Sequence, residues 1–94
     1  MGYEISLSPR AMKEIEQAID YYSENQNTVW KFYEELDICY EILKNNPFLE
    51  VRYRAMRALP MRVFPYIVLF TIEINEVFIY SIFNTYQSTS KYPK

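Results

Sequence analysis

Four arginines without an intervening acid lie within eleven positions of the chain: Arg52, Arg54, Arg57 and Arg62. Guanidinium groups bind phosphates and carboxylates well because each presents several fixed N–H donors. The spacing favours an anion-binding patch, for a nucleic-acid phosphate or for an acidic segment of a partner protein. A second interpretation stays open, in which each arginine taken alone is solvated or paired with an acid such as Glu50, Glu73 or Glu76.

The chain has no histidine and a single cysteine, Cys39. Ordinary zinc sites and catalytic triads built on imidazole are therefore excluded. Any chemistry must use arginine, lysine, tyrosine or carboxylate side chains, and no metal or cofactor is expected. Cys39 lies on a predicted helix face, where we expect a buried structural thiol.

The net charge of −2 is unevenly distributed. Residues 1–50 carry four Lys or Arg against ten Asp or Glu, which gives −6, and residues 51–94 carry six against two, which gives +4. A chain whose halves differ in sign can present a local anion-binding face without being basic overall.

Length and composition predict a single domain over residues 1–94, with 50% hydrophobic residues and room for one core. The longest apolar run, Val63–Ile72, is too short for a membrane span, and the N-terminus has no export signal. We therefore expect a cytoplasmic protein.

Periodicity predicts an α+β fold in which a helical hairpin covers an antiparallel sheet of four or five strands, in the order β-α-α-β-β-β. Ser8 and Thr28 are the predicted N-caps of the two helices. Asn75 is the residue expected to tolerate the tight turn between the last two strands. The predicted elements are a strand over Tyr3–Ser8, helices over Pro9–Glu24 and from Thr28 to about Asn45, and strands over Val51–Arg57, Tyr66–Ile72 and Val77–Phe83.

The helix faces can be assigned from their spacing. Met12, Ile15, Ile19 and Tyr22 are predicted to face inward on the first helix, and Glu14 is predicted to face water. On the second helix Tyr33 is expected in the core. Glu34, Glu35, Asp37 and Glu41 look like a solvated face.

Two further aromatic residues near the start of the second helix suggest a contact surface. Val29 to Tyr33 cannot all face one side of a helix, so at least one of Trp30 and Phe32 should be exposed. Exposed aromatic side chains suggest a protein contact.

The block "RALPMRVFPYIVLFTIEINEVFIYSIFNT" resembles the signature region of the RelE/ParE superfamily of type II toxins, also called plasmid stabilisation proteins. The resemblance lies in Arg62 followed by Phe64, Pro65 and Tyr66, then an apolar hairpin, then an alternating strand that runs into a polar tail. "SPRAMKEIEQAIDYY" is similar to the first helix of the family. The similarity spans roughly Tyr3 to Thr89.

The resemblance implies a growth-inhibiting toxin neutralised by a cognate antitoxin, whose disordered segment folds onto it in a hetero-oligomer. RelE-like members cleave mRNA on the ribosome, and here Arg52, Arg54 and Arg62 would stabilise the phosphate charge while Tyr86 moves protons. ParE-like members inhibit DNA gyrase and are not nucleases. The residues expected to contact antitoxin or target are Arg57, Trp30, Phe32 and Asn84.

The tail departs from the family pattern, which often reads His-x-Arg-Arg-Asp-Pro. Here Asn84 stands at the histidine position, and Gln87, Ser88 and Thr89 replace the basic-acidic-proline run. Ribosome binding depends on phosphate neutralisation, so a pI of about 5.1 argues against an efficient ribosomal nuclease. We therefore predict a ParE-like growth inhibitor, with a RelE-like endoribonuclease as the alternative and a homologue without toxicity as a third possibility.

Overall fold

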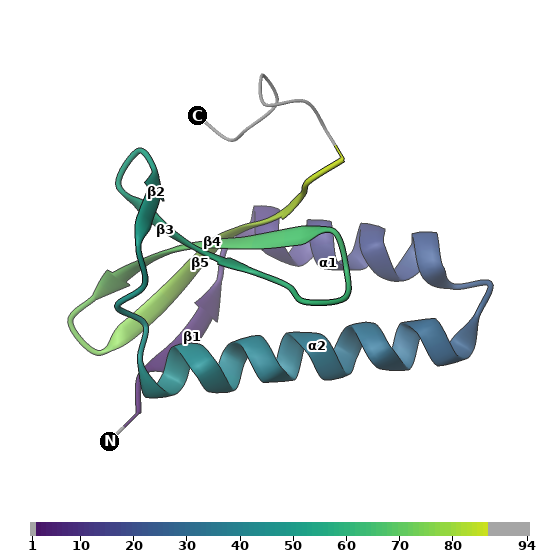
Figure 1. Ribbon diagram of the computed structural model, residues 1–94, viewed down its shortest axis with the longest axis horizontal. Helices are drawn as coiled ribbons and strands as arrows, with labels where there is room; N and C mark the ends of the chain where they lie inside the picture. Colours follow the sequence, from purple (N-terminus) through teal and green to yellow (C-terminus); the bar gives the residue numbers. More distant parts are fainter. Residues whose placement is uncertain (1, 87–94) are drawn as a thin grey trace.

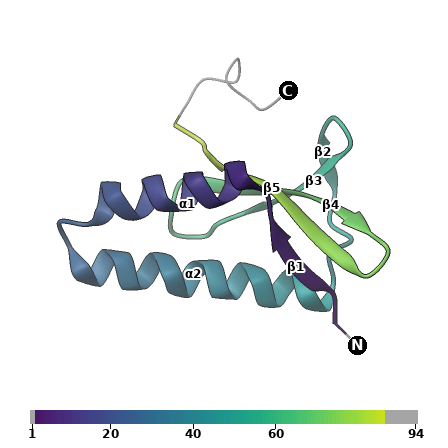
Figure 2. The same ribbon diagram turned by 180° about the vertical axis from the view of Figure 1, so that it is seen from behind.

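The computed structural model describes residues 2–86 of the chain. In this range the two helices lie side by side and cover one face of a five-stranded sheet (Figures 1 and 2). This two-layer α+β architecture confirms the predicted fold class. The elements in chain order are β1 (Glu4–Leu7), α1 (Pro9–Tyr22), α2 (Gln26–Asn45), β2 (Val51–Tyr53), β3 (Met56–Pro60), β4 (Tyr66–Glu73) and β5 (Glu76–Asn84).

The strand order across the sheet is β1-β5-β4-β3-β2. Strands β2 to β5 form an antiparallel meander, as predicted. Strand β1 runs parallel to β5, with Ile5 opposite Val77, so the sheet is mixed and not wholly antiparallel. A parallel pair needs a long connection, and the whole chain from α1 to β4 provides it here. Alternation of side chains along Tyr3–Ser8 predicts a strand but not its partner.

The predicted strand Val51–Arg57 is in fact a short hairpin. Strands β2 and β3 pair with each other, and the chain reverses at Arg54 and Ala55. Arg54 has a φ of 54°, in the left-handed region that glycine favours. This reversal could not be predicted from the sequence, because no Gly, Asn or Asp lies at the turn.

The turn between β4 and β5 consists of Ile74 and Asn75. Ile74, not Asn75, adopts the left-handed conformation, with a φ of 47°. The prediction that Asn75 would be the tolerant residue is therefore wrong. Asn75 contributes its carbonyl oxygen instead, which accepts the backbone N–H of Glu4 at 3.0 Å and fixes the start of β1.

The caps of the helices explain where they begin. The Ser8 hydroxyl accepts the backbone N–H of Ala11 at 2.9 Å, and Pro9 is the first helical residue, as predicted. Helix α2 begins earlier than predicted because Asn25, not Thr28, is its N-cap. The Asn25 side chain accepts the backbone N–H groups of Asn27 and Thr28. Thr28 thus lies inside the first turn.

The core between helices and sheet contains a cluster of aromatic rings. Phe32 packs edge-on against Phe64, with ring centroids 5.3 Å apart, and against Tyr66 at 5.7 Å. Helix α1 enters this core through two fully buried alanines, Ala11 and Ala18. Small side chains at these positions let the helix approach β5 closely.

Two residues predicted to lie in the core are largely exposed. Met12 is 48% exposed and Tyr33 is 43% exposed. Both residues lie beside the buried face of their helix. Helical spacing alone predicts which residues form that face only to within one position. None of the helices in residues 2–86 is long and apolar enough to cross a membrane.

Candidate functional site

The four clustered arginines do not converge on one site. Arg52 lies on β2 and Arg54 in the following turn, whereas Arg62 lies in the loop after β3. These two loops lie at opposite ends of β3 (Figure 1). A five-residue strand is about 15 Å long at ~3.3 Å per residue. The four arginines therefore do not form the single anion-binding patch that their spacing predicts.

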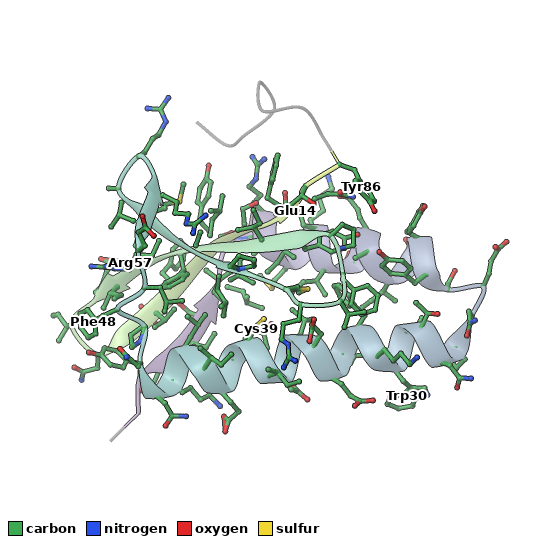
Figure 3. All side chains as sticks on the ribbon, in the orientation of Figure 1. Glu14, Trp30, Cys39, Phe48, Arg57 and Tyr86 are labelled. Carbon is green, nitrogen blue, oxygen red and sulfur yellow. The ribbon has the colours of Figure 1, made fainter. Side chains whose placement is uncertain are left out.

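Arg57 has a structural environment of its own. Its Nη1 donates to the carbonyl oxygen of Leu49 at 2.6 Å, and its guanidinium lies over the ring of Phe48, 5.6 Å from the centroid. Figure 3 shows Arg57 and Phe48 on the same side of the molecule, at the edge formed by β2. Arg57 thus fastens the segment between α2 and β2 to the sheet. Arg52 is exposed and lies 3.8 Å from Glu50 in a surface ion pair.

Tyr86 and Asn84, by contrast, lie together beside a cavity of about 300 Å³ between the second half of α1 and the ends of β4 and β5. The Asn84 side chain accepts the backbone N–H of Tyr86 at 2.9 Å. Thr85 donates its backbone N–H and its hydroxyl to the carbonyl oxygen of Pro65. These bonds fix the chain after β5 beside the cavity.

Four tyrosines line this cavity, which we call the tyrosine pocket: Tyr21, Tyr22, Tyr66 and Tyr86. Tyr21 and Tyr86 are 78% and 86% exposed and form the rim, whereas Tyr66 is buried. Burial, together with the neighbouring Tyr22, to which it is hydrogen-bonded, raises the pKa of Tyr66.

Glu14 also lines the tyrosine pocket, contrary to its predicted water-facing position. Its Oε1 accepts the Ser81 hydroxyl at 2.8 Å and the Ile82 backbone N–H at 2.9 Å. Its Oε2 lies 3.4 Å from Nε of Arg10. The pairing of β4 with β5 has a register shift between Leu69 and Phe70, close to Ser81. At this irregular point of the sheet, the Glu14 side chain from α1 accepts the backbone N–H of Ile82.

Glu35 has the equivalent role on α2. It is only 6% exposed, and its Oε1 accepts the backbone N–H groups of Arg62 and Val63, both at 2.7 Å. The prediction that Glu35 belongs to a solvated face is therefore wrong. Acid spacing on a helix cannot reveal this role, because the donors come from a loop 27 positions away.

Comparison with known proteins decides the family. The sequence model of the ParE toxin of the type II toxin–antitoxin system parDE matches residues 5–88. The chain belongs to the ParE toxin family. Its fold agrees with this assignment: a structure described as "Chromosomal ParDE TA system from P. aeruginosa" is similar with a TM-score of 0.72 at 15% identity. That match covers 87% of this chain and 95% of the other. No curated protein matches the chain in sequence.

In this ParE-family chain the predicted ribonuclease residues do not line one common pocket. Tyr86 lies at the tyrosine pocket, whose lining within the described residues contains no lysine or arginine. Arg52, Arg54 and Arg62 are not among its lining residues. In residues 2–86 no group of three His, Cys, Asp or Glu side chains could hold a metal.

The aromatic residues of α2 in this ParE-family chain point in opposite directions. Trp30 is 59% exposed and points away from the sheet (Figure 3), whereas Phe32 is completely buried. Phe32 is therefore not available for a surface contact in this structure. Cys39 is buried, as predicted. Burial is the larger cause and the nearby charge of Glu35 the smaller cause that together raise the pKa of its thiol to about 11.

The structure describes only the first residues of the tail that follows β5. Asn84 and Tyr86 are placed as above. Gln87, Ser88 and Thr89, where the sequence departs from the family pattern, lie outside the described residues.

Proposed function

We propose that this chain is the toxin of a type II toxin–antitoxin pair that arrests growth in the ParE manner, by inhibiting DNA gyrase in the cytoplasm, and that a cognate antitoxin neutralises it. Membership of the ParE toxin family supports the toxin role. The observation that carries the choice of target is that none of the four clustered arginines is among the residues that line the pocket beside Tyr86.

The alternative, a RelE-like ribosome-dependent endoribonuclease, needs cations around the scissile phosphate and a group that moves protons. Tyr86 could move a proton, but its surroundings include Glu14 and no cation among the lining residues. A carboxylate beside the reacting phosphate would repel it. The net charge of −2 also disfavours docking on ribosomal RNA.

Trp30 is our proposed anchor for the antitoxin on α2. Exposed tryptophans are enriched among residues that dominate binding energy, because they bury a large area when a partner covers them. We expect Trp30→Ala to weaken antitoxin binding roughly tenfold or more. Ile38→Ala is the matched control, since Ile38 is 44% exposed on the same helix.

The test combines cells and purified components. The chain is induced alone and together with the small open reading frame beside its gene, and growth is followed. Purified chain is then added to DNA gyrase in a supercoiling assay on relaxed plasmid. We expect growth arrest that the neighbour relieves and loss of supercoiling that the purified neighbour restores. Arrest with unchanged supercoiling would reject gyrase as the target, and failure of any neighbour to copurify or rescue would reject the pairing.

A further inference from the structure

The tyrosine pocket has a composition suited to one class of ligand. Four tyrosine side chains and one carboxylate, Glu14, are among its lining residues, and the lining within residues 2–86 contains no lysine or arginine. The face of an aromatic ring carries negative electrostatic potential and attracts cations. An anion would find no positively charged side chain among the described residues that line the pocket.

The helix dipole acts in the same direction. Tyr21 and Tyr22 are the last two residues of α1 and both line the pocket, and the last turn of α1 contains no basic residue. The C-terminal end of a helix carries partial negative charge and favours a nearby cation. Dipole, rings and carboxylate thus all favour positive charge.

The same surface already holds a guanidinium in this way. Arg10 lies 3.4 Å from the Glu14 carboxylate and over the Tyr80 ring, 5.7 Å from its centroid. Arg10 itself is not among the residues that line the tyrosine pocket. A second guanidinium in the pocket would share the Glu14 carboxylate with Arg10, Ser81 and Ile82, and Tyr21, Tyr22 and Tyr86 would supply the rings.

The volume of the tyrosine pocket limits the size of the ligand. A cavity of about 300 Å³ is at the lower end of the ~300–1,000 Å³ range of ligand pockets, which suits one long side chain. Tyrosines at a rim provide contact area at a low cost in conformational entropy, a feature of protein-binding surfaces. Arginine fits better than lysine because its planar group stacks on rings while it pairs with a carboxylate.

We propose that the tyrosine pocket binds an arginine side chain of a protein partner. That this partner is the antitoxin or the target rests on the proposed function. The preference of the pocket for a guanidinium does not rest on the proposed function, because it follows from the lining residues alone.

The experiment uses the full-length chain, labelled with ¹⁵N, and a short blocked peptide, acetyl-Gly-Arg-Gly-amide. Citrulline replaces arginine in the control peptide, which keeps the shape and removes the charge. We expect the arginine peptide to shift the backbone amide signals of Tyr21, Tyr22 and Tyr86 with a Kd on the order of 1 mM at low salt. The citrulline peptide should bind roughly threefold or more weakly.

Two variants test whether the arginine peptide binds in the tyrosine pocket. Tyr21→Ala should weaken the arginine peptide roughly threefold, the effect of one lost cation–π contact, and exposure of Tyr21 makes unfolding of this variant unexpected. Tyr33→Ala, on the far helix, should change nothing. Glu14→Gln is not the primary variant because Glu14 also holds β5.

Equal shifts with both peptides, shifts confined to the acidic face of α2, or an unchanged affinity in Tyr21→Ala would overturn the proposal. These outcomes are independent of gyrase and antitoxin. A toxin that is neutralised normally but fails to distinguish the peptides would reject the pocket alone, and a chain without toxicity that prefers the arginine peptide would reject the proposed function alone.

Discussion

The carboxylate of Glu35 on α2 accepts the backbone N–H of Arg62 at 2.7 Å, and the same oxygen accepts the neighbouring N–H of Val63. The loop between β3 and β4 is thereby tied to the helix layer by a buried charge. This bond places Arg62 by its backbone N–H and leaves its side chain exposed, so the bond itself does not require an arginine at this position.

Loss of this carboxylate should be costly. Glu35→Ala leaves two backbone donors without a partner at a site that is 6% exposed, and we expect a loss of about 3 kcal/mol in the free energy of unfolding. Glu34→Ala is the matched control, because Glu34 is exposed on the same helix, and should change stability by less than about 0.5 kcal/mol. Urea unfolding followed by circular dichroism measures both. Equal losses in the two variants would show that the Glu35 contacts do not stabilise the loop.

Glu14 and Ser81 offer a test of the corresponding link between α1 and β5. Their side chains are hydrogen-bonded at 2.8 Å, and Ser81 is fully buried. In a double-mutant cycle of Glu14→Gln and Ser81→Ala we expect a coupling energy of about 1 kcal/mol, because Ser81→Ala removes the hydrogen bond and Glu14→Gln removes the charge that strengthens it. Additive losses in the free energy of unfolding would mean that the two side chains do not interact.

The turn between β4 and β5 should be open to improvement. Ile74 holds a φ of 47° with a β-branched side chain that is 94% exposed, so its side chain gains little from burial while its backbone is strained. We expect Ile74→Gly to raise the free energy of unfolding by about 1 kcal/mol. Ile74→Val keeps the branched side chain and should give no gain. A lower melting temperature for Ile74→Gly would contradict the assigned turn geometry.

Stability should fall at alkaline pH. The pKa of the Cys39 thiol is raised from 9.0 to about 11 in the folded chain, so above pH 9 the unfolded chain releases a proton that the folded chain retains. Stability is therefore complete below pH 9 and is lost as pH rises towards 11. Between pH 8 and pH 10 we expect Cys39 to account for a loss of about 1 kcal/mol.

The control for this pH dependence is Cys39→Ala. This variant should be less stable than the wild type at pH 7, because alanine fills less of the buried site than cysteine does. Its free energy of unfolding should nevertheless fall less than that of the wild type between pH 8 and pH 10. Tyr40 and Tyr66, whose pKa values burial also raises, contribute above pH 10 in both proteins. Parallel curves for the two proteins from pH 8 to pH 10 would contradict a buried neutral thiol.

Much of the fold could be predicted because its signals are local. The Ser8-Pro9 cap, the apolar spacing of α2 and the alternation in β5 each depend on neighbours within a few residues. The partner of β1 and the positive φ at Arg54 and Ile74 could not be predicted, since they depend on how distant segments meet.

The site was less predictable for the same reason. Four arginines close in sequence were expected to be close in space, but a hairpin at Arg54 and the length of β3 separate them. Glu14 and Glu35 look like any exposed acids until the backbone donors of Ile82 and Arg62 are placed beside them. The tyrosine pocket draws on α1, β4 and β5, so no single motif contains it.

The most direct test of the account asks whether transcripts are cut while this chain arrests growth. The chain is induced in cells and abundant mRNAs are examined by primer extension, beside an Arg62→Ala and Tyr86→Phe double variant. A ParE-like toxin predicts that growth stops while transcripts stay full length, in the wild type and in the double variant alike. Discrete cuts in translated mRNA that vanish in the double variant would contradict the account and assign the chain to the ribonuclease branch.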